Sequence, residues 1–294
     1  MFSTQNPTII NMKKILQFVQ ITLLLIITSC SSSKDTGWDE LSLKGRVQSV
    51  TAKTYEAEYK FGEITKGELT YNDNYYFVFD KDGRLLEASD FDDDGDIRFR
   101  RINTYAGDII SESEFYNSKG LLYKLKFYSN KGRFEGCVAY GASGDEEGRF
   151  THEYDGDWLS SVKNFNADGE STGVTSYIKG CNGKIQEQIT YNSEGKEESR
   201  NTYEYNGKII VSKTHEYISS WRDYKSITKE LYDKHGFVVV EREEGEFEDG
   251  EYEMGKSIVY EYEYDKAGNW IKRTSFDKTN KNSIEITERE IKYF

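Results

Sequence analysis

Tyr264-Asp265-Lys266-Ala267-Gly268 is one of nine five-residue motifs that begin with an aromatic residue, end in glycine and do not contain a shorter Tyr-x-Gly motif. Asp or Asn comes directly after the aromatic residue in most of them. Asp and Asn start turns by hydrogen bonding to the backbone ahead of them, and glycine supplies the positive φ that many turns require. The pattern therefore predicts tight turns, which begin at Phe79, Phe91, Tyr116, Tyr128, Tyr140, Phe165, Tyr191, Tyr232 and Tyr264.

Turn glycines recur at an interval of 12 or 13 residues from Gly83 to Gly169, with shorter Tyr-x-Gly motifs in between. About four turn residues leave roughly eight for a strand, which is a normal strand length. Between the turns polar and apolar residues alternate, as in Lys124-Leu125-Lys126-Phe127. A period of two predicts strands with one buried face and one face in water. We find no long stretch with helical spacing after the first 30 residues.

Short strands at regular spacing predict an all-β fold, an antiparallel meander of repeated hairpins. A single hairpin buries too little apolar surface, so neighbouring hairpins must stack into a continuous core. We therefore expect an elongated, curved sheet or a β-solenoid-like array. It would form one domain over residues 38–294, with opening strands in 38–74 and repeats in 75–294.

The N-terminal segment has the features of a secretory leader. Met12-Lys13-Lys14 is basic, an apolar run follows to Ile27, and Thr28-Ser29-Cys30 ends it with small residues. The run is shorter than the roughly 20 residues that span a bilayer. Ile27-Thr28-Ser29-Cys30 resembles the lipobox of bacterial lipoproteins, which implies lipidation of Cys30. We expect a signal peptide over 1–29, or one that starts at Met12, and a lipid anchor and tether over 30–37. The alternative is a buried apolar helix with an incidental cysteine.

The formal net charge of −13 bears on the class of partner. Proteins that bind nucleic acids need basic patches to displace counterions from phosphates. No Lys/Arg cluster is present in the sequence, so no nucleic-acid partner is expected. The expected partners are a membrane, through lipid on Cys30, and an unidentified protein or glycan. The expected location is the cell envelope at the outer membrane, either periplasmic or surface-exposed.

The Tyr-Asp-x-x-Gly motif, alternating with Tyr-x-Gly turns, resembles the YD repeats of RHS proteins over residues 75–294. The chain looks most like the small RHS-repeat-like lipoproteins of Bacteroidetes. Large RHS proteins wind a sheet into a shell around a toxin, but this array is far too short for that, so the shell function is not expected here. Residues 247–252 also resemble MORN-type repeats, which occur in some antitoxin and immunity proteins.

Candidate sites for chemistry are few. Asp90, Asp92 and Asp94, followed by Gly95, match the first half of a calcium loop, but Arg101 stands where a bidentate Glu is needed. An acidic hairpin turn is the alternative, no other cofactor is expected, and calcium is the first ion to test.

The three histidines have no zinc-site spacing, and phosphate-loop and nucleophile-elbow motifs are missing from the sequence. We therefore expect no enzymatic activity.

The predicted function is that of a membrane-anchored, non-enzymatic interaction or structural module. A glycan-binding surface lipoprotein is the first alternative, with Trp221 and Trp270 as ligand-facing aromatic residues, and an immunity-like repeat protein is the second. Glycan binding would need a concave aromatic strip on the solvent face of the sheet. Cys137 and Cys181 are expected to be free, partly buried thiols rather than a disulfide.

Overall fold

The computed structural model describes residues 36–294, apart from 208, 220–223, 248–251 and 279–282. These residues form one sheet of nineteen strands and one short helix, α2 (Gly37–Glu40). In these ranges, no helix has the length and apolar character needed to cross a bilayer. The strands are β1 (Val47–Lys60), β2 (Glu63–Leu69), β3 (Asn74–Phe79), β4 (Leu85–Phe91), β5 (Ile97–Ala106), β6 (Ile109–Asn117), β7 (Gly120–Asn130), β8 (Arg133–Gly141), β9 (Glu146–Asp155), β10 (Trp158–Asn166), β11 (Ser171–Lys179), β12 (Ile185–Asn192), β13 (Glu197–Asn206), β14 (Ile209–Ser219), β15 (Tyr224–Tyr232), β16 (Val238–Phe247), β17 (Tyr252–Tyr264), β18 (Trp270–Asp277) and β19 (Ser283–Tyr293).

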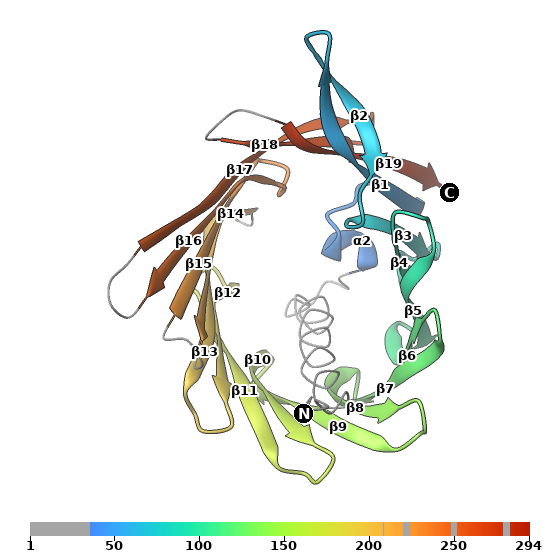
Figure 1. Ribbon diagram of the computed structural model, residues 1–294. Helices are drawn as coiled ribbons and strands as arrows, with labels where there is room; N and C mark the ends of the chain where they lie inside the picture. Colours follow the sequence, from blue (N-terminus) through green and yellow to red (C-terminus); the bar gives the residue numbers. More distant parts are fainter. Residues whose placement is uncertain (1–35, 208, 220–223, 248–251, 279–282) are drawn as a thin grey trace, which may run out of the picture.

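The sheet closes on itself into a barrel (Figure 1). From β3 to β19 each strand pairs antiparallel with the next, and β19 then pairs antiparallel with β1, from Val47 opposite Tyr293 to Glu56 opposite Glu285. The other edge of β1 pairs with β3 through residues 49–52 and with β2 through residues 55–60. Because β2 pairs only with the outer half of β1, the ring itself contains eighteen of the nineteen strands.

Closure overturns the predicted shape. The chain is all-β, but the prediction of an elongated, curved sheet or a β-solenoid-like array is wrong, since the opening strand β1 pairs with the last strand, β19. Turn spacing sets the length of each strand, whereas closure depends on twist and tilt accumulated over the whole sheet. Closing a sheet also satisfies the two edges that an open array would expose.

Glycine turns lie where the motif predicts them. All eight glycines from Gly83 to Gly169 in the 12-to-13-residue series have positive φ. At the first of these turns the amide of Gly83 donates to the carbonyl of Asp80, and the Asp80 carboxylate accepts the amides of Asp82 and Arg84. Equivalent backbone bonds recur at seven later turns, so one local geometry is repeated around the ring.

Tyrosines of the shorter Tyr-x-Gly motif have a structural role that the sequence does not reveal. The hydroxyls of Tyr105, Tyr154 and Tyr205 donate to the carbonyls of Leu85, Phe134 and Ile185, each at or beside the start of the preceding strand. All three bonds join residues 20 positions apart. Each tyrosine therefore ties its strand to the strand before it, and this explains why the aromatic residue recurs.

Helix α2 lies inside the ring, next to β3 and β4 (Figure 1). Thr36 caps it with a capping box to Asp39. The Trp38 indole donates to the carbonyl of Val47 at 2.8 Å, and Trp38 packs on a cluster of buried side chains from β1, β3 and β4. The chain therefore enters the described structure from within the barrel. The cluster consists of Val47, Val50, Phe79 and Leu85.

Candidate functional site

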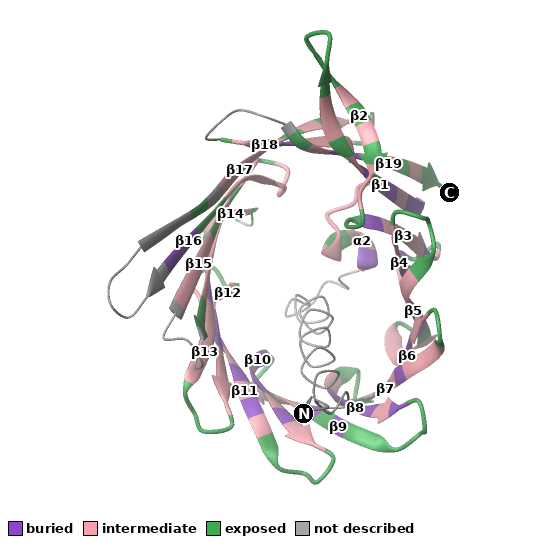
Figure 2. Cartoon of the chain, viewed as in Figure 1, coloured by how far each residue is buried: buried purple, intermediate pink, exposed green. Residues whose placement is uncertain are grey.

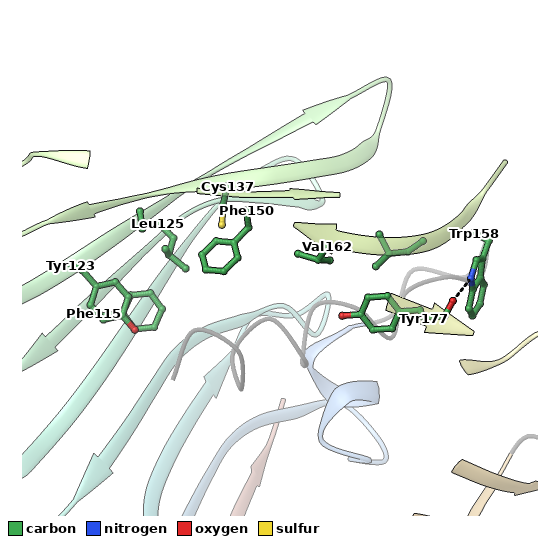
Figure 3. Close-up of a cluster of buried hydrophobic side chains, with 10 residues drawn as sticks. Phe115, Tyr123, Leu125, Cys137, Phe150, Trp158, Val162 and Tyr177 are labelled. Atoms are coloured by element: carbon green, nitrogen blue, oxygen red, sulfur yellow. Dashed lines mark hydrogen bonds between the residues drawn. The ribbon is translucent and has the colours of Figure 1, made fainter. Parts of the chain in front are cut away.

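The inner wall of the barrel, meaning the face of the sheet on the side of α2, carries the main apolar cluster (Figure 3). Phe115 and Leu125 are completely buried, and the rings of Phe115 and Tyr123 stack with centroids 4.2 Å apart. Stacked aromatic pairs add to the free energy gained from burial alone. This cluster lines the inside of the ring from β6 to β11, and buried polar side chains such as Gln188 and Asn201 continue the same row on β12 and β13. Its buried members are Phe115, Tyr123, Leu125, Cys137, Ala139, Phe150, Trp158, Leu159, Val162 and Tyr177.

The outer wall is charged. Side chains alternate along a strand, so Lys124 faces outward between Tyr123 and Leu125, and directly opposite residues of paired strands share a face. The Lys124 ammonium lies 2.7 Å from the Glu114 carboxylate and 3.1 Å from that of Glu112 on the neighbouring strand. The same kind of cross-strand ion pair recurs around the ring, as in Arg100–Glu87, Lys163–Glu153, Arg200–Glu187, Lys225–Glu216 and Lys272–Glu263.

This outer wall differs from that of a barrel that spans a membrane. A spanning barrel presents an apolar band about 25 Å tall to lipid, and each Lys or Arg on that face costs about 2–4 kcal/mol at the bilayer midplane. Here charged residues occupy the middle of the outer faces of β6, β7 and β19, the last through Glu288, Glu290 and Lys292. Exposed ion pairs contribute only about 0–1 kcal/mol each to the free energy of folding. Their main effect is therefore to keep the outer wall hydrated.

Among the residues that the structure describes, three side chains on the inner wall have buried polar atoms without a hydrogen-bond partner of good geometry. They are Nε of Arg101, the hydroxyl of Tyr123 and both ring nitrogens of His152. Arg101 and Tyr123 lie on either side of Phe115 in one cross-strand row. Burial lowers the pKa of Arg101, while the charge of Glu40 on α2 raises it, and burial raises the pKa of Tyr123. These groups carry no sequence motif, which is why sequence reasoning missed them.

His152 is expected to make the stability of the fold depend on pH. Burial lowers its pKa to about 4, against 6.5 for the exposed side chain, so the folded barrel holds it neutral. Between pH 6.5 and 4 the unfolded chain binds the additional proton, so stability is expected to fall as pH drops through this window. His152→Phe, which keeps the contact with the Phe134 ring, is expected to reduce this slope. Urea unfolding midpoints at pH 7.5 and 4.5 measure it, and an unchanged slope would contradict the assignment.

The structure places only some of the residues predicted as sites. Cys30 and Trp221 lie outside the described residues. Trp270 is buried, with the guanidinium of Arg289 over its ring at 3.3 Å from the centroid. Aromatic faces covered in this way are not presented to solvent.

The acidic turn proposed for calcium is held by protein groups. The Asp90 carboxylate pairs with Arg98, and the Asp92 carboxylate accepts the amide of Asp96, as at the other turns of the repeat. Asp94 is exposed. Among the described residues, no group of three or more His, Cys, Asp or Glu side chains is arranged to hold a metal ion.

The two cysteines described by the structure are both free thiols. Cys137 is buried on the inner wall, where burial raises its pKa to about 12, and Cys181 is exposed. A thiol with so high a pKa does not ionise at neutral pH and is a poor nucleophile. Cys137 therefore serves packing, and Cys181 is the thiol open to reagents.

Comparison with known proteins finds similar shapes at low identity. No protein-family model matches the chain, and no curated protein matches it in sequence. Porin-like proteins from Bacteroides uniformis and Bacteroides vulgatus are similar in structure, with 10% and 11% identity and TM-scores of 0.42 and 0.36. The first match covers 85% of this chain and 99% of the porin-like protein, and the second covers 84% and 98%.

A Tc holotoxin pore from Photorhabdus luminescens is also similar, with 12% identity and a TM-score of 0.35. That match covers 80% of this chain but only 14% of the toxin chain. At these values, none of the three proteins is evidence of a shared function.

Proposed function

We propose that this chain is a lipid-anchored, non-enzymatic protein of the cell envelope. Its barrel is surrounded by water and acts as an interaction module rather than as a pore. The observation that supports this most directly is the polarity of the two walls. Cross-strand ion pairs recur around the outside, and a buried aromatic core lines the inside from β6 to β11. A porin-type barrel needs the opposite arrangement, with an apolar outside and a polar, water-filled inside.

The lipid anchor on Cys30 would supply the membrane attachment that the wall cannot. Several acyl chains hold a protein stably on a membrane, whereas one alone binds marginally. The described structure begins at Thr36, six positions after Cys30, so a short polar segment separates the proposed anchor from the barrel. Attachment and barrel are therefore separable, and this makes the proposal testable.

Fractionation of cells that express the full chain tests the proposal. The wild-type protein is expected in the membrane fraction, released by detergent, and Cys30→Ala is expected to move to the soluble fraction with its fold intact by circular dichroism. Cys181→Ala is the matched control and is expected to stay with the wild type, because its thiol lies on the exposed surface of the barrel. A Cys30→Ala protein whose leader has been removed, as its mass shows, and that still remains in membranes until detergent is added would show a spanning barrel and overturn the proposal.

Glycan binding finds less support. The hydroxyls of Tyr105, Tyr154 and Tyr205 are bonded to backbone carbonyls and are not available to donate to sugar hydroxyls. Trp270 is covered by Arg289. The interaction module is therefore the function that we propose, with a protein as its partner class.

A further inference from the structure

The up-and-down order of the strands places the turns of the barrel at two opposite rims. Each strand from β3 to β19 runs antiparallel to the next, so alternate turns lie at the same rim. We call the rim that contains the turn between β3 and β4 the entry rim, and the opposite one the far rim. Turns of the entry rim include residues 80–84, 107–108, 131–132, 156–157, 180–184, 233–237 and 265–269, and turns of the far rim include 92–96, 118–119, 142–145, 167–170 and 193–196.

The described chain begins at the entry rim and is fastened there. The amide of Gly37 donates to the carbonyl of Gly83 at 2.8 Å, in the turn between β3 and β4. The amide of Lys44 donates to the side-chain oxygen of Asn269 at 2.7 Å, and the side-chain nitrogen of Asn269 donates to the carbonyl of Lys44 at 2.8 Å. Asn269 is buried at the end of the turn between β17 and β18. The segment 37–44 is therefore held at two separate turns of one rim.

The length of the tether limits how the barrel can be oriented on a membrane. Thr36 stands six positions after Cys30, and six residues span at most about 20 Å when fully extended. A ten-residue strand such as β13 is about 33 Å long and, at a tilt of about 40°, spans about 25 Å along the barrel axis. A tether that starts at the entry rim is therefore too short to reach a membrane at the far rim.

The outer wall is the other surface that a tethered barrel could place on lipid. Helix α2 lies inside the ring (Figure 1), so the tether starts within the circumference and would have to bend over the rim to reach the side. The outer wall also carries recurring ion pairs, and charged groups prefer water to lipid. An anchor on Cys30 therefore brings the entry rim to the membrane surface.

The charges of the two rims favour the same orientation. Turns at both rims are exposed (Figure 2). The entry rim has an exposed lysine at five of its turns, whereas the described turns of the far rim expose more carboxylates than lysines. Anionic lipids attract lysines near their surface and repel carboxylates, within about 10 Å. The lysines are Lys81, Lys131, Lys184, Lys234 and Lys266, and the exposed acidic residues of the far rim include Asp93, Asp94, Asp96, Asp168 and Glu170.

We propose that the lipid on Cys30 and its short tether hold the entry rim against the membrane, so that the barrel is upright and its far rim points into the water. The inference rests on the proposed lipid anchor and adds an orientation to it. The membrane surface then covers the turns around the point where the chain enters. The far rim is the end of the barrel that remains accessible to a partner.

Energy transfer from a dye on one cysteine to labelled lipid measures this orientation with the full, lipidated chain. Cys181 is an exposed thiol in an entry-rim turn, whereas Cys137 is buried with a pKa of about 12 and reacts poorly with maleimide dyes. The matched variant, Cys181→Ser with Ser193→Cys, moves the thiol to the exposed turn at the other end of β12. In phosphatidylcholine vesicles with a rhodamine-labelled lipid, the dye at position 181 is expected to be quenched several-fold more strongly than the dye at position 193.

Flotation of the same vesicles distinguishes failure of the orientation from failure of the anchor. Equal quenching at the two positions, or stronger quenching at position 193, in protein that floats with the vesicles would overturn the orientation and leave the anchor in place. Lipidated protein that does not float with the vesicles would refute the anchor, and the orientation with it.

A longer tether tests the cause of the orientation. Insertion of about forty Gly and Ser residues between Ser33 and Lys34 gives a flexible segment with an average span of about 35 Å, more than the height of the barrel. In uncharged vesicles the difference in quenching between positions 181 and 193 is then expected to fall toward zero, because the barrel can turn freely. A difference that stays at the wild-type level would overturn the short tether as its cause.

Discussion

A chain that ends at Lys278, and so lacks β19, is expected to lose the folded barrel entirely. β19 closes the ring between β18 and β1, and its removal exposes one edge on each of them. It also removes the buried hydrogen bond between the hydroxyls of Thr54 and Thr287, at 3.0 Å. Long exposed edges lead to aggregation. Size-exclusion chromatography and far-ultraviolet circular dichroism are expected to show aggregated or unfolded protein.

Shortening the β1–β2 hairpin is the matched control for this truncation. Replacing residues 59–64 with Asn-Gly joins Glu58 to Thr65 through a two-residue turn, since these residues are directly paired and stand in the ladder two positions from Lys60 and Glu63, which flank the present turn. The ring pairings of β1 with β3 and with β19 up to Tyr55 are unaffected. This variant is expected to fold and to melt within a few degrees of the wild type. If the truncated chain folds as well as this control does, closure does not hold the structure together.

Leu125→Ala is expected to lower the free energy of unfolding by about 2–5 kcal/mol, the range for large-to-small changes in a packed core. Leu125 is completely buried on the inner wall. Lys126 is the next residue of β7 and faces outward, with its ammonium 5.3 Å from the centroid of the Tyr140 ring. Lys126→Ala is expected to cost less than about 1 kcal/mol, because exposed cation–π contacts are weak.

Urea unfolding of the two variants at pH 7 measures the polarity of the wall at adjacent positions. The ratio of the two effects matters more than either value, since both substitutions lie in one strand and share a local backbone. Equal costs at Leu125 and Lys126, or a larger cost at Lys126, would contradict a core on the inside and water on the outside.

Local structure could be predicted from the sequence because it depends on local chemistry. The glycine positions required for turns, such as Gly83 and Gly95, stand at fixed offsets from Asp or Asn, and both have positive φ in the structure. The alternation in Lys124-Leu125-Lys126 places leucine inside and lysines outside, and it could also have indicated the ion pairs to Glu112 and Glu114.

Closure and the inner-wall groups could not be predicted in the same way. The pairing of β1 with β19 joins residues more than 200 positions apart, and nothing near Val50 or Ile291 specifies it. Arg101 and His152 have no distinctive neighbours in sequence, because their burial depends on which strands surround them. Helix α2 is only four residues long, too short to leave a periodic signal.

The eighteen-strand ring limits how this protein can change length. Because the chain runs up and down alternately, its first and last strands meet antiparallel only if their number is even. Gain or loss of one strand would leave β1 and its closing neighbour parallel, with a different hydrogen-bond pattern. Duplication or deletion of strands therefore preserves the antiparallel pairing of β1 with β19 only when whole hairpins are gained or lost. Each hairpin is about 24 residues long, the interval from Gly83 to Gly107. Wider and narrower relatives should differ from this chain by multiples of that unit.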